Sequence, residues 1–158
     1  YGASKLAGEQ AIKAYCPVNS AIVRTSWVYS SHGNNFVKTM LRLMAEKEQL
    51  SVVSDQIGCP TNAKGLAKYL WQLAERETLD PIYHYSDLGV ASWYDFAIAI
   101  QDIAFEQGKL EKKIPIQPIP SSNYPTPAMR PIISLMVQNS ALSKQYWRCA
   151  LIKCIEEL

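Results

Sequence analysis

The sequence has no apolar stretch that approaches the roughly 20 residues needed to span a membrane. Its first residues lack the charged region and apolar core of a signal peptide. An excess of one charge is also missing, because the formal net charge is +2 and the longest basic run is Lys112-Lys113. We therefore expect a cytoplasmic protein whose partners include neither a membrane nor a nucleic acid.

Metal-ligand and disulfide patterns are equally scarce. The four cysteines, Cys16, Cys59, Cys149 and Cys154, form no C-x-x-C pair, and only two histidines accompany them. This set does not match a zinc site, so we predict no metal-binding residues. The favoured interpretation is reduced thiols in the core of a cytoplasmic protein.

A glycine-rich turn for a dinucleotide is absent as well. Binding the pyrophosphate of such a cofactor requires a G-x-G-x-x-G or G-x-x-G-x-x-G turn between a strand and a helix. The seven glycines form no such motif; they are Gly2, Gly8, Gly33, Gly58, Gly65, Gly89 and Gly108.

What is present fits an ordinary globular chain of 158 residues, with 48% hydrophobic and 19% charged residues. Helical spacing of apolar residues predicts helices over 36–47 and 62–76, from Ser92 onward, and over 146–158. Short β-rich runs at 20–29, 50–55, 81–86 and 114–119 predict strands between them. This alternation indicates an α/β layer structure. Two prolines make the run 114–119 an edge strand at best, and 121–134 is predicted to be extended loop.

Three predicted helices have a defined inward face. "SWYD" has the form of a capping box at Ser92, followed by a buried face at Phe96, Ile100 and Ile103. The apolar positions of the helix over 62–76 fall on one side, namely Ala63, Leu66, Ala67, Leu70, Trp71 and Ala74. In the last helix the inward positions are Ala150, Leu151, Cys154 and Leu158.

The sequence opens with Tyr1 and Lys5, four residues apart, which places both side chains on one face of a helix. An ammonium close to a phenol favours its ionised form, and the same lysine can bind a ribose hydroxyl. This is the chemistry that a carbonyl reductase requires. The spacing alone is weak, since roughly 0.6 such pairs are expected by chance, and a surface lysine beside a helical tyrosine is the alternative.

The residues around this pair carry a resemblance. "YGASKLAGE" resembles the Tyr-x-x-x-Lys helix of the extended short-chain dehydrogenase/reductase superfamily. "RTSWVY", "NNFVKTMLRL", "DQIGCPT" and "PTPAMRP" follow in the order found in its dTDP-4-dehydrorhamnose reductase family. The resemblance implies the C-terminal part of an NAD(P)-binding Rossmann fold joined to a smaller α/β domain that binds a sugar nucleotide. Residues 1–50 would be the Rossmann part and 51–158 the substrate-binding domain, with segments that return to the Rossmann layer.

The resemblance also assigns roles to single residues. It makes Tyr1 the proton donor and gives Lys5 the task of positioning the nicotinamide ribose. Thr25 and Ser26 would lie at the cofactor, beside the nicotinamide. Trp27 would contact the substrate, with ordinary core packing as its alternative.

Three further residues would bind the sugar nucleotide. Asp55 and Gln56 would supply polar groups in the pocket, although a plain strand-to-helix loop explains them nearly as well. Arg130 would face the diphosphate, because a guanidinium matches phosphate geometry; a solvent-exposed loop arginine is its alternative.

The sequence departs from the family at two places. Ile133 stands where the family has asparagine before the serine, and the stretch from Leu135 to Trp147 looks shortened and altered. A polar contact to the nucleotide is then missing, which affects nucleotide preference and activity. Because the glycine-rich turn is also absent, we expect the chain to be the C-terminal half of a longer reductase, to bind nicotinamide cofactor weakly alone, and to expose a sheet edge.

The function implied is reduction of the C4 ketone of dTDP-4-dehydro-L-rhamnose with NADPH or NADH, in nucleotide-sugar and cell-surface polysaccharide biosynthesis. The expected partners are the dTDP-sugar, the missing N-terminal half and a second copy in a homodimer. The family also uses Mg²⁺ in dimerisation, but no ligands are assigned here. Two alternatives remain: a sibling sugar-nucleotide epimerase or dehydratase, and a non-catalytic binding or regulatory protein on the same fold.

Overall fold

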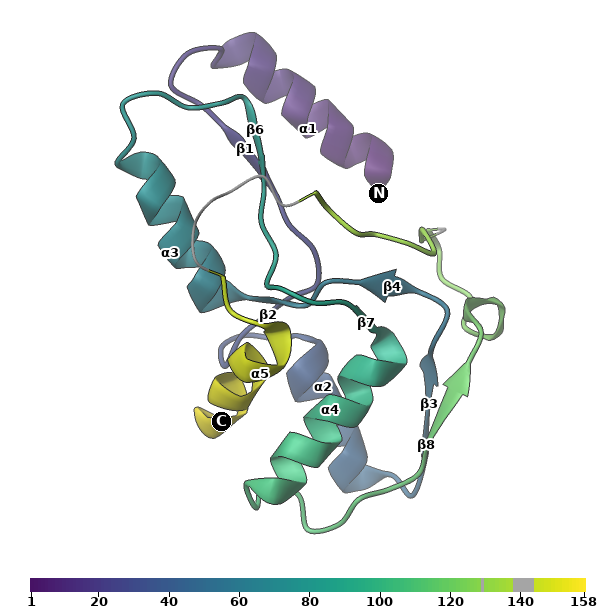
Figure 1. Ribbon diagram of the computed structural model, residues 1–158. Helices are drawn as coiled ribbons and strands as arrows, with labels where there is room; N and C mark the ends of the chain where they lie inside the picture. Colours follow the sequence, from purple (N-terminus) through teal and green to yellow (C-terminus); the bar gives the residue numbers. More distant parts are fainter. Residues whose placement is uncertain (129, 138–143) are drawn as a thin grey trace.

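The computed structural model describes residues 1–128, 130–137 and 144–158, and helices alternate with short strands along the chain (Figure 1). The α/β class predicted from the sequence is confirmed. The helices are α1 (Gly2–Tyr15), α2 (Phe36–Glu46), α3 (Ala63–Ala74), α4 (Trp93–Glu106) and α5 (Trp147–Glu156), with a 3₁₀ turn η1 (Ser121–Asn123). The strands are β1 (Ile22–Arg24), β2 (Val28–Tyr29), β3 (Leu50–Val53), β4 (Ile57–Gly58), β5 (Thr61–Asn62), β6 (Ile82–His84), β7 (Ala91–Ser92) and β8 (Ile116–Ile119).

The strands pair two by two. Three pairs are parallel, β1 with β6, β2 with β5 and β3 with β8, and the pair of β4 with β7 is antiparallel. Each of these strands therefore has one strand neighbour within the described residues. This agrees with the prediction that the proline-containing run 114–119 forms an edge strand, since Pro118 of β8 lies opposite Val52 of β3.

The β1–β6 pair lies between two helices, with α1 on one side and α3 on the other (Figure 1). On the α3 side, Tyr69 and Leu73 pack with Tyr83 and Tyr85 in a small hydrophobic cluster. On the other side, α1 buries none of its residues completely. The two faces of this sheet are therefore covered very differently.

The predicted inward face of α3 is wrong in part. Leu70 is 45% exposed and Trp71 is 72% exposed, whereas Tyr69 and Leu73 are buried. The partners of α3 explain the rotation, because the aromatic rings of β6 and the following residue attract the helix face that carries Tyr69. A count of aliphatic positions alone selected the neighbouring stripe.

The main hydrophobic core surrounds α4. Its predicted capping box is confirmed, because the Ser92 hydroxyl accepts from the Asp95 N–H while the Asp95 carboxylate accepts from the Ser92 N–H. Phe96 and Ile100 are completely buried, as predicted. The helix packs against α2, α5, β3 and β8. In α5 the predicted inward residues Ala150, Leu151 and Cys154 are buried, whereas Leu158 lies beyond the helix and is 38% exposed.

The thiols are divided between core and surface. Cys59 and Cys154 are buried and free, as predicted, but Cys16 and Cys149 are exposed. The prediction that all four belong to the core is therefore wrong for two of them. Cys149 is exposed because it occupies the outer side of α5, whereas Ala150, Leu151 and Cys154 face inward.

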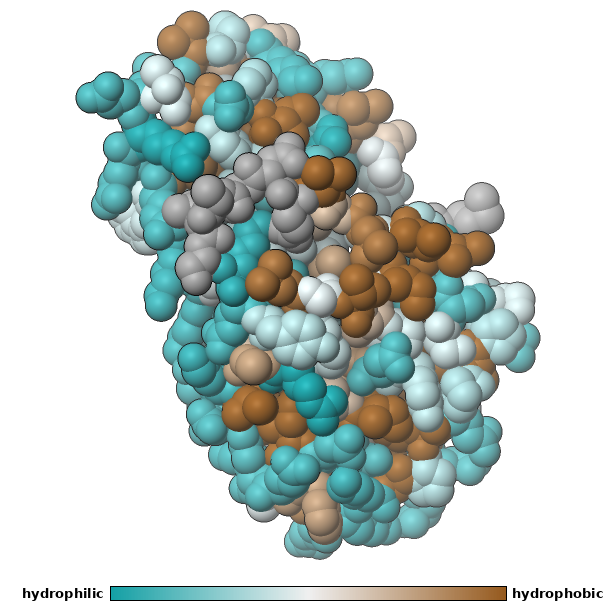
Figure 2. Space-filling view, in the orientation of Figure 1, coloured by the Kyte–Doolittle hydropathy of each residue, from teal (hydrophilic) through white to brown (hydrophobic). Residues whose placement is uncertain are grey.

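In the predicted loop 121–134, the described residues, all but 129, form the short turn η1 and a bridge between Ile133 and Ile57 of β4. After this bridge the chain crosses the middle of the molecule, where apolar side chains gather on the surface (Figure 2). The exposed apolar residues of this segment are Ile132, Ile133, Leu135 and Val137. Of the altered stretch from Leu135 to Trp147, residues 138–143 lie outside the described residues.

Candidate functional site

Tyr1 and Lys5 lie at the beginning of α1, on one face of the helix, as their spacing predicts. The Tyr1 side chain is 70% exposed, and the Lys5 Nζ lies 5.7 Å from the centroid of its ring. The Tyr1 backbone carbonyl accepts hydrogen bonds from the Lys5 N–H at 3.1 Å and from the Ser4 hydroxyl at 2.8 Å. The first helical turn thus fixes the backbone of the pair, while both polar side-chain ends stay open to a ligand.

A third predicted residue reaches the same ring from the far part of the chain. The guanidinium carbon of Arg130 lies 4.8 Å from the centroid of the Tyr1 ring, within the range of a cation–π contact. Arg130 is exposed and follows the proline-framed segment 125–127. Two cations therefore flank one phenol, an arrangement suited to a negatively charged ligand.

Thr25 and Ser26 follow β1 directly. Thr25 is exposed. Ser26 is half-buried, and its hydroxyl donates to the carbonyl of Cys59 at 2.8 Å. This bond joins the segment after β1 to the loop before β5. The Ser26 hydroxyl is therefore engaged in a contact that holds the two segments together.

Trp27 has an unusual backbone and an unusual neighbour. Its φ angle is +47°, in the left-handed region that a bulky side chain rarely adopts. The indole is half-buried and stacks on Trp93, with ring centroids 3.6 Å apart and planes inclined by 10°. The carbonyl of Trp27 accepts from the Thr61 N–H at 3.1 Å. The side chain is therefore packed against Trp93 on one face and remains partly exposed.

Asp55 makes a local structural contact. Its carboxylate accepts from the Ser121 N–H at 2.9 and 3.0 Å and from the Ser121 hydroxyl at 2.9 Å. The bond from this backbone N–H, the main influence, lowers the pKa of Asp55. The carboxylate therefore holds the turn η1 to the end of β3. The neighbouring Gln56 is half-buried.

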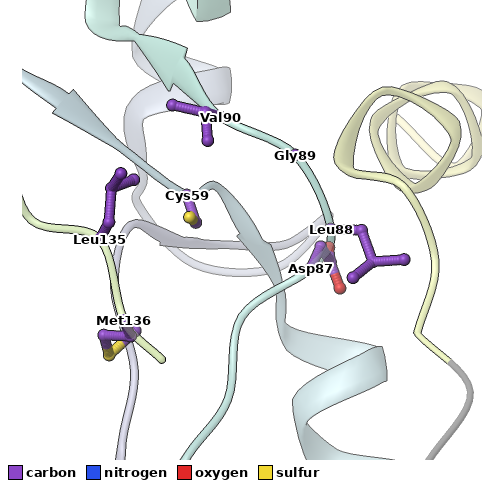
Figure 3. Close-up of a pocket in the computed structure, with 7 residues that line it drawn as sticks. All are labelled: Cys59, Asp87, Leu88, Gly89, Val90, Leu135 and Met136. Atoms are coloured by element: carbon purple, nitrogen blue, oxygen red, sulfur yellow. The ribbon is translucent and has the colours of Figure 1, made fainter. Parts of the chain in front are cut away.

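A cavity of about 190 Å³ lies beside β4 and the loop before β7 (Figure 3). Its wall is mostly apolar, with one buried carboxyl group: Cys59, Asp87, Leu88, Gly89, Val90, Leu135 and Met136. Asp87 is 2% exposed, and its Oδ2 accepts from the Asn62 N–H at 2.9 Å. Burial raises the pKa of Asp87 to about 6.

A second hollow, of about 180 Å³, lies between the loop after β2, the start of α3 and the end of α5. Lys64 and Glu157 form an ion pair across it at 2.5 Å, and the Ser31 hydroxyl donates to the same carboxylate at 2.9 Å. No group of three or more His, Cys, Asp or Glu residues in the described part of the chain is arranged to hold a metal ion. Within the same residues, no helix has the length and apolar character of a membrane span.

The structure therefore brings together Tyr1, Lys5 and Arg130. Separately, it joins Ser26 to the β4–β5 loop and Trp27 to β5. Within the described residues, no hydrogen bond, ion pair or ring contact links the first group to the second. Two features escaped sequence reasoning: the stacking of Trp93 on Trp27 and the burial of Asp87. The first had no signal beyond a tryptophan in the first turn of a capped helix, and the second had none.

Comparison with known proteins identifies relatives along the whole chain. Residues 1–158 match the family described as RmlD substrate binding domain. The dTDP-4-dehydrorhamnose reductase of Escherichia coli K12 is 39% identical over 167 residues, covering 100% of this chain and 56% of that protein. The enzyme of the same name from Aggregatibacter actinomycetemcomitans is 46% identical over 141 residues, covering 86% of this chain and 48% of that protein.

The fold has a solved counterpart as well. A crystal structure of dTDP-4-dehydrorhamnose reductase from Bacillus anthracis in complex with NADP superposes with a TM-score of 0.88 at 38% identity. The match covers 99% of this chain and 54% of that one. The chain therefore spans about half the length of the relatives that it matches.

Proposed function

We propose, because this chain belongs to the RmlD substrate binding domain family, that it provides the tyrosine–lysine pair and the sugar-nucleotide-binding part of a dTDP-4-dehydrorhamnose reductase. The reaction is reduction of the C4 ketone of dTDP-4-dehydro-L-rhamnose to the hydroxyl of dTDP-L-rhamnose. Such a reaction belongs to the biosynthesis of nucleotide sugars for cell-surface polysaccharides.

The observation that carries the proposal is the cluster at the start of α1. Tyr1 and Lys5 share one helix face, and Arg130 closes on the same ring from the far part of the chain. A phenol flanked by two cations can give a proton to a ketone oxygen, since the positive charges stabilise the phenolate that remains. An anionic diphosphate would be attracted to the same place.

The residues present fit the nicotinamide end of a cofactor. The Tyr1 and Lys5 side chains are exposed on one face, so a ribose and a nicotinamide can approach them. NADPH is favoured because the Bacillus anthracis relative was solved with NADP. When bound, the reduced nicotinamide supplies a hydride. Tyr1 supplies the proton, Lys5 binds the ribose, and Thr25 and Ser26 lie on the nicotinamide side.

The sugar nucleotide is assigned to the opposite side of this cluster. Trp27 offers the exposed part of its ring to the deoxysugar, and Arg130 pairs with the diphosphate. Asp55 and Gln56 shape the edge of the pocket. Because Ser121 already donates to the Asp55 carboxylate, we assign Asp55 a role in holding the loop and leave direct polar contacts to Gln56.

The test is a chimera in which this chain replaces the matching part of the Escherichia coli relative. We expect it to oxidise NADPH when dTDP-4-dehydro-L-rhamnose is added. Tyr1→Phe should lower the turnover at least about 100-fold, since proton transfer by a positioned side chain contributes about 10²–10⁴-fold. Tyr15→Phe is the matched control, because Tyr15 is 86% exposed at the other end of α1 and should change little.

The chimera also separates the alternatives. Binding of the dTDP-sugar without NADPH oxidation, in a chimera shown to be folded, would favour a non-catalytic binding protein. Epimerisation or dehydration of a dTDP-sugar without net reduction would favour a sibling enzyme. Equal activity of the Tyr1→Phe and unsubstituted chimeras would contradict the assigned role of Tyr1.

A further inference from the structure

The stacked pair of Trp27 and Trp93 has a geometry that differs from the one that aromatic pairs prefer. Aromatic pairs prefer offset or edge-to-face contacts with centroids about 4.5–7 Å apart. Here the centroids are 3.6 Å apart in nearly parallel planes, and Trp27 also has a positive φ of 47°. Strained conformations of this kind persist only where the surroundings impose them, and they are concentrated at functional sites.

The surroundings of the pair are rigid on both sides. Trp93 is the first residue of α4 and lies within the capping box that Ser92 and Asp95 form, and its ring centroid lies 4.7 Å from that of Phe36. At Gly58, an added Cβ would lie 2.6 Å from Cε2 of Trp27. The indole of Trp27 therefore has Trp93 against its face and a position in β4 that has room for glycine only.

One polar atom of Trp27 remains available to a ligand. Its Nε1 donates to none of the described residues, and it is not one of the three buried polar atoms there that lack a partner. Solvent therefore reaches this N–H. The pair thus holds a hydrogen-bond donor and the exposed part of an indole ring at a fixed angle.

We propose that Trp93 is a positioning residue that, together with Gly58, fixes the ring plane of Trp27 for recognition of the sugar ring of the nucleotide sugar. This inference rests on the proposed function, since it takes the ligand to be a dTDP-6-deoxysugar. Trp93 acts through Trp27 and does not itself contact the sugar. The apolar ring faces the deoxygenated side of the sugar, and Nε1 donates to a sugar hydroxyl.

The test compares the affinities of the full chain for dTDP and dTDP-L-rhamnose by calorimetry. The dissociation constant of dTDP divided by that of dTDP-L-rhamnose isolates the contribution of the sugar. Trp93→Leu should reduce this ratio about fivefold to tenfold, the value of an aromatic contact, and leave the affinity for dTDP unchanged. Trp93→Phe should restore most of the ratio, and the near-ultraviolet circular dichroism of the stacked pair should fall in both variants.

Two further variants complete the design. Trp71→Leu is the matched control, because Trp71 is 72% exposed on α3, and the ratio should not change. Gly58→Ala displaces Trp27 while Trp93 stays, and it should reproduce the selective loss even if Trp93→Leu does not fold.

Either of two results would overturn the inference. One is an unchanged ratio in Gly58→Ala, together with an unchanged ratio in Trp93→Leu where that variant folds. The other is a wild-type chain that binds dTDP-L-rhamnose no more tightly than dTDP. NADPH oxidation by the chimera would still support the proposed function in both cases, so the two failures are distinguishable.

Discussion

Arg24 of β1 donates two hydrogen bonds to Glu9 of α1, from Nε at 2.8 Å and from Nη2 at 2.6 Å. This bidentate ion pair is important for holding α1 in place, because α1 buries none of its residues completely. It also joins the helix that carries Tyr1 and Lys5 to the strand that leads to Thr25 and Ser26. The two proposed cofactor-binding segments are thus coupled by one ion pair.

The pair predicts a pH-dependent attachment of α1. The hydrogen bond from Arg24 is the main cause that lowers the pKa of Glu9 below its ordinary value of 4.5. A depressed pKa means that the stabilisation is complete above about pH 4.5 and is lost as the pH falls through the lower, folded-state value. We expect the amides of α1 to lose protection from hydrogen exchange in that acid range before the amides of α4 do.

Glu9→Gln is the variant that checks this attachment. It should weaken the protection of α1 already at neutral pH and remove its additional loss in acid. Glu46→Gln is the control, since Glu46 forms an exposed ion pair with Arg42 within α2. The same acid-dependent loss in wild-type and Glu9→Gln chains would contradict the role of the pair.

For Asp87 we expect a pH dependence of stability opposite in sign to that of Glu9. Burial raises the pKa of its carboxyl from 3.8 to about 6. Between pH 3.8 and about pH 6, Asp87 has lost its proton in the unfolded chain but keeps it in the folded chain. The free energy of unfolding therefore falls as the pH rises through this range. Above about pH 6 the contribution of Asp87 no longer changes with pH. Asp87→Asn retains an acceptor for the Asn62 N–H and should remove this part of the pH dependence.

Urea unfolding from about pH 4 to pH 7 measures the effect. The free energy of unfolding of Asp87→Asn should rise relative to that of the wild type as the pH increases, and the difference should level off above the folded-state pKa. Asp80→Asn, at an exposed position, should follow the wild type throughout. A constant difference between Asp87→Asn and wild type over the whole range would show that Asp87 does not titrate there.

The sequence predicts the helices of this fold better than it predicts their faces. The start of α4 is predicted to within one residue, because a capping box and a strong apolar spacing agree at its N-cap, Ser92. The inward face of α3 was misplaced because it depends on aromatic partners in β6 that are distant in sequence. The strands β4, β5 and β7 have two residues each, too few for any alternation to show.

The candidate site divides in the same way. Tyr1 and Lys5 lie within one helical turn, so their spacing alone places them together. The approach of Arg130 to Tyr1 is a long-range contact that the sequence motif suggested as a role but not as a location. The Trp27–Trp93 stack depends on a positive φ angle at Trp27, for which a tryptophan gives no local signal.

Gln101 predicts a specific loss of stability. The side chain is 5% exposed; its amide donates to the Ile114 carbonyl at 3.1 Å and accepts from the Ile114 N–H at 2.9 Å. Gln101→Leu would leave both backbone groups buried without partners, and we expect the free energy of unfolding to fall by about 2–4 kcal/mol. Gln72→Leu, on the exposed side of α3, is the control. A similar small change in both variants would mean that water replaces the lost bonds.

Replacing Gly89 by alanine should lower the free energy of unfolding more than the same substitution at Gly108, which serves as the matched control. Both have positive φ angles, 97° and 69°, so alanine at either position adds backbone strain of about 1 kcal/mol. They differ in space: a Cβ on Gly108 meets nothing within 4 Å, whereas one on Gly89 overlaps the Tyr146 ring and comes within 2.8 Å of Cδ1 of Trp147. Because Trp147 begins α5 and is buried in the main core, it cannot move without cost.

We therefore expect Gly89→Ala to lower the free energy of unfolding by about 2–4 kcal/mol and Gly108→Ala by about 1 kcal/mol, measured by urea denaturation. Both variants carry the strain of a positive φ. The additional loss in Gly89→Ala then reflects its packing against the start of α5, with a smaller part from its φ of 97°, which lies farther from the left-handed helical region than the 69° of Gly108. Equal losses would mean that α5 shifts freely, and the loop before β7 would then not be fixed by α5.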